Sequence, residues 1–222
     1  MMYPDLGGKT VIVTGASQGI GAAIAKAFAA TGANTVVHYR SAKNLADSIV
    51  SDISKNSGNA IPVGAALDEA AGVDHLFEKA GEIYGNVDVL INNAGSFPNS
   101  PLLDLGLDDW RRMYADNMES TFLCTKAAGK IMMGHGGGAI VNIASTSALN
   151  PGIAHPHYNS AKAAMVMLTQ SAAQELGQYN IRVNAVAPGL VYRDGLEEHW
   201  PDGYARYCDA SPLSCVVQPE DI

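Results

Sequence analysis

Short apolar segments alternate with longer helical segments along most of this chain. Valine, isoleucine and threonine dominate the short segments, which predicts strands over residues 10–15, 34–40, 59–67, 87–95, 138–145 and 181–189. Helical periodicity predicts helices between them, over residues 20–32, 44–58, 70–85, 108–132 and 157–179, the fourth of them long and bent. This order indicates an α/β fold, in which a doubly wound parallel sheet carries helices on both faces.

The pattern predicts a single domain over residues 1–222. The chain has no linker, repeat or low-complexity segment, and 47% of its residues are hydrophobic. After Gly189 the alternation gives way to a polar, turn-rich segment in which one short helix is expected. We expect no membrane span and no secretory signal, because no apolar run has the required length or position. Three cysteines outside any CxxC pattern indicate a reducing compartment, so a cytoplasmic protein is expected.

The first predicted strand runs into the glycine-rich segment TGASQGIG. Gly15 permits a tight turn, Gly19 lets a ligand approach the backbone, and Gly21 lets the next helix pack on the sheet. With Ser17 and Ile20 between them, these residues form a cradle whose free amides and helix dipole suit a dinucleotide pyrophosphate. A purely steric turn is the alternative, but the strand before and the helix after favour a Rossmann-type cofactor site. No Lys-Ser/Thr pair follows the glycines, which disfavours a Walker-type nucleotidase.

The end of the second predicted strand indicates which cofactor is bound. The segment HYRSAK contains no acid to bind free ribose hydroxyls, whereas Arg40 and Ser41 could bind a 2′-phosphate. NADP(H) is therefore expected in preference to NAD(H), which remains possible. The alternative for Arg40 is a solvated surface position.

A second group of residues suits proton transfer. Ser145 ends the fifth predicted strand, and Tyr158 and Lys162 lie one helical turn apart at the start of the next helix. All three belong to the carboxyl edge of the sheet, above the same crevice as the glycines. A nearby ammonium would lower the pKa of the phenol, and Ser145 could hold a substrate oxygen where charge develops. The alternative for a Tyr/Lys pair alone is simple packing.

Taken together, these motifs resemble the short-chain dehydrogenases/reductases, in their compact single-domain subgroup, over about residues 7 to 222. The resemblance rests on TGASQGIG, NNAG at 92–95, DNM, a serine thirteen residues before the tyrosine, YNSAK, and PG at 188–189. The sequence is most similar to 3-oxoacyl-carrier-protein reductases and glucose dehydrogenases of that family, which leaves the substrate open.

The resemblance implies a role for each matching position. Tyr158 would be the catalytic acid/base, Lys162 would lower its pKa and bind the nicotinamide ribose, and Ser145 would orient the carbonyl. Asn117 would hold a water that relays protons to solvent. The implied cofactor contacts, besides the tyrosine and lysine themselves, are Gly15, Ser17, Gly19, Ile20, Gly21, Arg40, Ser41, Leu67, Asn93, Ala94, Gly95, Pro188, Gly189 and Val191.

Three departures from the family pattern stand out. Ala66 occupies the position of the usual adenine-binding Asp, with Asp68 two residues later, and Arg193 stands near the position of a usual threonine. Arg193 could instead reach a phosphate or an acidic substrate. Relatives also continue beyond the equivalent of Ile222 with another helix and strand. We therefore expect PEDI to begin a helix, and the physiological protein to be longer and homo-oligomeric, as a tetramer or dimer.

The expected activity is hydride transfer between NADP(H) and a small-molecule carbonyl or secondary alcohol. A net charge of −8 disfavours nucleic-acid binding. No metal site is expected, since His155 and His157 have no third ligand at useful spacing. Two other classes are alternatives: a non-catalytic NADP-binding regulatory or scaffold protein, and a nucleotide-sugar dehydratase or epimerase. The first usually loses the Tyr or Lys, and the second has GxxGxxG and a larger C-terminal domain.

Overall fold

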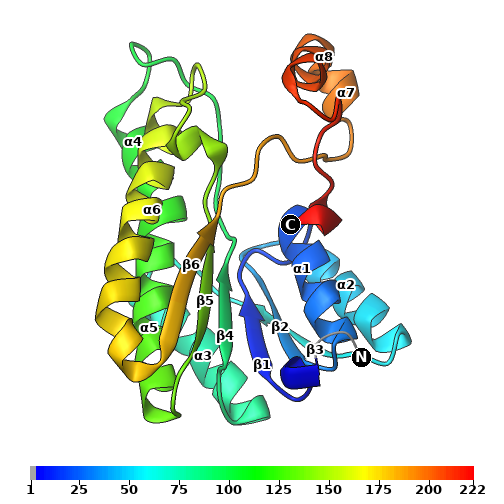
Figure 1. Ribbon diagram of the computed structural model, residues 1–222, viewed down its shortest axis with the longest axis vertical. Coiled ribbons are helices and arrows are strands. Elements are labelled where there is room, and N and C mark those ends of the chain that lie inside the picture. The colour runs from blue at the N-terminus through cyan, green and yellow to red at the C-terminus, as the bar shows by residue number, and fades with distance from the viewer. Residues whose placement is uncertain (1–3) are drawn as a thin grey trace.

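The computed structural model describes residues 4–222. All six predicted strands are present and pair in parallel in the order β3-β2-β1-β4-β5-β6, so the strand order reverses beside β1 (Figure 1). The strands are β1 (Thr10–Val13), β2 (Asn34–Tyr39), β3 (Asn59–Gly64), β4 (Val89–Asn92), β5 (Gly138–Ile143) and β6 (Ile181–Val186). Most end a few residues before the predicted boundary, because the residues after each strand form the loops of the site.

Helices cover both faces of this sheet, as expected. The main helices are α1 (Gly19–Ala30), α2 (Lys43–Lys55), α3 (Ala70–Tyr84), α5 (Ser120–Gly134) and α6 (Pro156–Leu176). Because side chains alternate along a strand, Val11 and Val13 point into the core beneath α1 and α2, whereas Ile12 points into the core beneath α3 and α5. The fold is therefore the Rossmann-type doubly wound sheet that the sequence predicts.

The long predicted helix over residues 108–132 contains a break of defined geometry. It consists of α4 (Leu107–Tyr114), a π-helical turn (Ala115–Glu119) and α5, in one continuous helical segment. The π turn accounts for the predicted bend, since an extra residue per turn disturbs the helical ladder. It also carries Asn117, which is buried.

The segment after β6 forms two short helices, α7 (Leu196–His199) and α8 (Pro201–Ala210), rather than one. Both lie beyond the carboxyl ends of the strands (Figure 1). The chain then returns to the body: Val191 and Val217 form an isolated parallel bridge, and Ile222 packs against the core of the α1 face. The sequence PEDI forms a 3₁₀ turn over Pro219–Asp221. Among residues 4–222, no helix is both long and apolar enough to cross a membrane.

Candidate active site

The glycine-rich loop joins β1 to α1 and has the geometry of a cradle. Gly15 and Gly19 adopt φ angles of +63° and +54°, which side-chain-bearing residues rarely adopt. A Cβ on Gly15 would lie 2.9 Å from Ala94 Cα, and one on Gly21 would collide with the Gly15 carbonyl. By contrast, no atom of the described chain lies within 4 Å of a Cβ built on Gly19. The loop is thus packed on its sheet side and open at Gly19, which fits a ligand approaching the backbone there.

A histidine that the sequence analysis did not single out holds this loop in place. The Gly15 amide donates to Nδ1 of His38, 3.0 Å away, and Nε2 of His38 donates to the Ala65 carbonyl at 3.1 Å. This pairing requires the neutral imidazole with its proton on Nε2. Burial lowers the pKa of His38 to about 4, and the bond to Ala65 opposes that shift. His38 therefore links the glycine loop to the end of β3 as an uncharged bridge.

Asn93 fixes the other side of the loop. Its Nδ2 donates to the carbonyls of Thr14 and Gly15 at 2.9 and 3.0 Å, while the amides of Asn93 and Ala94 both donate to Thr14 Oγ1. The side-chain donors of Asn93 are consequently used within the protein. Asn93 and Ala94 shape the cleft rather than offering side-chain donors to a ligand.

The remaining predicted cofactor contacts lie around the same edge of the sheet. Leu67 is buried in the core, so only its backbone is available to a ligand. The Pro188 carbonyl accepts a bond from the Thr146 amide at 2.9 Å, and Gly189 packs beneath Tyr207 of α8. The bridge near Val191 uses the amide of Tyr192 and the carbonyl of Leu190. It therefore leaves the Val191 amide out of the pairing.

Ser145, Tyr158 and Lys162 meet at the carboxyl ends of β5 and β6. Ser145 begins a 3₁₀ turn, in which its Oγ accepts a hydrogen bond from the Ser147 amide at 3.1 Å, and its hydroxyl is close enough to that of Tyr158 to lower the pKa of the phenol. Lys162 lies one turn further along α6, with its Nζ 5.7 Å from the centre of the Tyr158 ring. The three residues predicted to act together are therefore neighbours in the fold.

Burial dominates the electrostatics of this group. It raises the pKa of Tyr158, and the bond with Ser145 acts in the opposite direction. Burial also lowers the pKa of Lys162 to about 8. The net shift at Tyr158 is opposite to the lowering expected from Lys162, because the phenolate loses hydration in the site.

Asn117 points into the same site from the π turn. Its Nδ2 donates to the carbonyls of Ser96 and Met113, at 2.9 and 3.1 Å, whereas its buried Oδ1 has no hydrogen-bond partner among residues 4–222. A Cβ built on Gly95 would collide with that Oδ1 and lie 3.8 Å from Lys162 Nζ. Glycine at this position thus leaves space between Asn117 and Lys162. A buried acceptor without a partner requires a donor from water or ligand.

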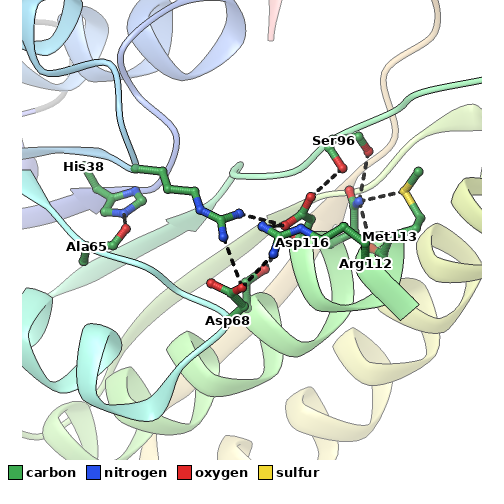
Figure 2. A network of polar contacts seen from close by, with 10 residues as sticks. His38, Ala65, Asp68, Ser96, Arg112, Met113 and Asp116 are labelled. Atoms are coloured by element: carbon green, nitrogen blue, oxygen red, sulfur yellow. Dashed lines mark hydrogen bonds and ion pairs between the residues drawn. The ribbon is translucent and has the colours of Figure 1, made fainter. Parts of the chain in front are cut away.

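Arg40 follows β2 and is held by two carboxylates. Nη1 donates to Asp116 Oδ1 at 3.0 Å, and Nη2 donates to Asp68 Oδ2 at 3.2 Å. Arg112 of α4 bridges the same two carboxylates, and Figure 2 shows it between Asp68 and Asp116. We call these four residues the charge cluster. No acid lies next to Arg40 in the sequence, but the fold brings two acids to it: Asp68 from the loop between β3 and α3, and Asp116 from the π turn. Ser41 is exposed beside Arg40.

A family model described as short chain dehydrogenase matches residues 9–202. The chain belongs to the short-chain dehydrogenase/reductase family. Like that family, it is an oxidoreductase that acts on alcohol and carbonyl groups and binds a nicotinamide dinucleotide.

Relatives within the short-chain dehydrogenases/reductases differ in substrate. The chain is 39% identical to a 3-oxoacyl-[acyl-carrier-protein] reductase of Synechocystis sp. over 96% of its length and 85% of the relative's. It is 38% identical to an L-rhamnose 1-dehydrogenase (NAD(P)(+)) of Azotobacter vinelandii, over 96% and 86%. A solved 7α-hydroxysteroid dehydrogenase, complexed with NADH and 7-oxo glycochenodeoxycholic acid, superposes with a TM-score of 0.92 at 34% identity, covering 97% of this chain and 84% of that one.

Sequence analysis missed several residues of the dehydrogenase site. His38, Ser96 and Arg112 belong to no motif, and Asp116 was used only as part of DNM; each acts through a contact that crosses between elements. Only Asp116 carried a usable signal, since it directly precedes Asn117 and would place a charge in the π turn.

Proposed function

We propose that the chain transfers hydride between NADP(H) and a carbonyl or secondary alcohol, with Tyr158 as the acid/base. The observation that carries this proposal is the closeness of Ser145 and Lys162 to the half-buried phenol of Tyr158, with the unpaired Asn117 oxygen on the Lys162 side of the site. The site also fits the cofactor of its family. The loop leaves open space for a ligand at Gly19, and the unpaired Asn117 Oδ1 offers a ligand or water a hydrogen-bond acceptor.

When bound, the nicotinamide supplies or accepts the hydride. In the reduction direction, the Tyr158 hydroxyl gives its proton to the substrate oxygen, and Ser145 donates a hydrogen bond to that same oxygen as charge develops. Lys162 donates one of its three protons to the Ile143 carbonyl, 2.7 Å away, which leaves two for ribose hydroxyls. Asn117 Oδ1 accepts a hydrogen bond from a water that connects Lys162 with solvent.

The raised pKa of Tyr158 favours the reduction of a carbonyl over the oxidation of an alcohol. A protonated phenol is the form required to deliver a proton to a carbonyl, and burial stabilises that form at neutral pH. Oxidation of an alcohol instead needs the phenolate. The positive charge of Lys162 supports that form, and cofactor binding adds the nicotinamide's own charge. A non-catalytic binding role would need neither the phenol nor the buried ammonium.

NADP(H) is proposed as the preferred cofactor because Arg40 lies at the end of β2 with its side chain half exposed. A homo-oligomer, most simply a tetramer, is proposed because α5 and α6 leave Phe122 and Met167 exposed. The proposed location is the cytoplasm, in keeping with three free cysteines. The substrate is proposed to be a small carbonyl or alcohol.

The proposal is tested by the oxidation of NADPH against a panel of ketones and aldehydes. Tyr158→Phe removes the transferable proton and should reduce turnover by about two to four orders of magnitude. NADPH binding, measured by fluorescence, should remain nearly unchanged. Near-normal turnover in this variant would remove Tyr158 from the mechanism.

A further inference from the structure

The charge cluster presents the guanidinium that would bind a 2′-phosphate in an already paired state. Arg40 is 48% exposed, but both of its terminal nitrogens point to carboxylates that are only 16% and 14% exposed, those of Asp68 and Asp116. Hydrogen bonds from these nitrogens occupy the positions that a bidentate phosphate contact would use. A phosphate therefore has to compete with Asp68 and Asp116 for Arg40.

Arg112 pairs with the same two carboxylates and so reduces their hold on Arg40. It lies 3.2 Å from Asp68 Oδ2 and 2.7 Å from Asp116 Oδ1, the same two oxygens that Arg40 contacts. Two arginines and two aspartates give the cluster no net charge. If Arg40 turns to a phosphate, Arg112 still neutralises both carboxylates in part. Without Arg112, Arg40 would be the one cation of the cluster paired with the two carboxylates, and both carboxylates would also repel the incoming dianion.

We propose that Asp68, Asp116 and Arg112 are specificity-determining residues for the cofactor. The two aspartates weaken the preference for a 2′-phosphate by competing for Arg40, and Arg112 restores part of it by holding the aspartates. The chain consequently accepts both NADP(H) and NAD(H), with a modest preference for the first. This inference rests on the proposed function, in which Arg40 contacts the 2′-phosphate.

The cluster also lies close to the reacting end of the site. Ser96 Oγ donates to Asp116 Oδ2 at 2.8 Å, and the Ser96 carbonyl accepts the bond from Asn117 at 2.9 Å. Asp116 is the direct neighbour of Asn117, so replacing it could disturb catalysis as well as binding. Asp68 and Arg112 are separated from Asn117 by at least one further residue, and are the better positions for a binding test.

The experiment uses two cofactor fragments, 2′,5′-ADP and 5′-AMP, which differ only in the 2′-phosphate. Isothermal titration calorimetry at fixed ionic strength gives the dissociation constant of each. Asp68→Asn should tighten 2′,5′-ADP binding about two- to fivefold, and Arg112→Gln should weaken it by a similar factor. Binding of 5′-AMP should not follow this pattern, and Arg40→Gln should abolish the preference for 2′,5′-ADP.

Matched variants separate the cluster from a general charge effect. Asp47→Asn removes the same charge from an aspartate paired with Lys43, and Arg111→Gln removes the same charge from the solvent side of α4. Both should leave the ratio of the two dissociation constants unchanged. Thermal unfolding confirms that each variant is folded before titration.

The outcomes distinguish the inference from the function on which it rests. Shifts of opposite sign in Asp68→Asn and Arg112→Gln, absent from both controls, support it. Shifts of the same sign, or shifts equal to those of the controls, overturn it while leaving the activity in place. If the unmodified protein binds neither fragment, the proposed cofactor site fails and the inference fails with it.

Discussion

The ammonium of Lys162 lies 5.7 Å from the centre of the Tyr158 ring. The two residues share one face of α6, and Lys162 is almost fully buried there. Its one hydrogen bond to oxygen within the described chain goes to the Ile143 carbonyl. Its other hydrogen bond is a long one to Met165 Sδ, at 4.0 Å. A buried ammonium with so few partners costs folding free energy, which is the physical reason why burial lowers its pKa to about 8.

Lys162→Met should therefore abolish turnover but stabilise the ligand-free protein. The Lys162 ammonium has a pKa of about 8 in the folded state and its ordinary pKa of 10.5 in the unfolded chain. The unfolded chain therefore keeps the proton to a higher pH. Between those values the unfolded state binds more protons, so wild-type stability rises with pH. The gain in the variant should be on the order of 1–3 kcal/mol at pH 7 and shrink toward pH 10.5. Denaturant unfolding of both proteins across this range measures it. Lys130→Met, at an exposed position of α5, should show no such gain.

His38 should make the protein sensitive to mild acid. Its pKa is about 4 in the fold against 6.5 in the unfolded chain, so its stabilising contribution is complete above pH 6.5 and is lost as the pH falls toward 4. The loss amounts to on the order of 3 kcal/mol. His38→Leu should cost about 1–3 kcal/mol at pH 7, because the Gly15 amide and the Ala65 carbonyl lose their partner. Its unfolding free energy should fall less steeply between pH 6.5 and 4. A variant as acid-sensitive as wild type would contradict the bridge, and His135→Leu at an exposed site is the control.

Gly95→Ala should displace Asn117. The added methyl collides with Asn117 Oδ1 and lies near Lys162, so turnover should fall about 10- to 100-fold, the effect of a small misplacement at a reacting site. Gly81→Ala is the matched control, because α3 leaves open space for a Cβ at that position. It should raise stability by up to about 1 kcal/mol and leave turnover alone. Steady-state kinetics measures the turnover of both variants, and thermal unfolding measures their stability. Equal turnover in the two would mean that the position of Asn117 is unimportant.

Arg40→Ala should separate the two cofactors. Loss of a charge-assisted contact should weaken NADPH binding by about 1–3 kcal/mol while barely changing NADH binding. The loss should be at the lower end of this range, since the wild-type guanidinium must first leave Asp68 and Asp116. Fluorescence titration with both cofactors measures it. Equal losses for NADPH and NADH would show that Arg40 does not contact the 2′-phosphate.

A charge on the exposed side of α6 should disrupt the proposed oligomer. Met167 is 60% exposed, and Met167→Glu would place a carboxylate in any interface formed there. Light scattering should then report a smaller species than for the unmodified protein. Leu45→Glu, at an exposed position of α2, should leave the mass unchanged. An unmodified protein that is already monomeric would refute the oligomer.

The sequence by itself determined the order of strands and helices and predicted the proposed reacting group. Alternating apolar strands and periodic helices are local patterns, and all six strands were found where they were predicted. Tyr158 and Lys162 are neighbours through helix geometry alone, Ser145 was placed beside them by the end of a predicted strand, and the resemblance supplied Asn117. The glycines of the loop were likewise identifiable, because their role depends on local backbone conformation.

The tertiary structure alone decided which residues support the glycine loop and Arg40, and in which direction the pKa values of Tyr158 and Lys162 are shifted. His38 supports the glycine loop across 23 positions of sequence, and Arg40 meets Asp68 and Asp116 across 28 and 76. Burial, which sets the pKa of Tyr158 and Lys162, depends on the packing of the whole domain. Such contacts leave no trace in a local motif, because they arise when separate strands and helices converge on one edge of the sheet. Sequence patterns therefore predicted the residues of the proposed reaction, whereas the fold decided which carboxylates lie against Arg40.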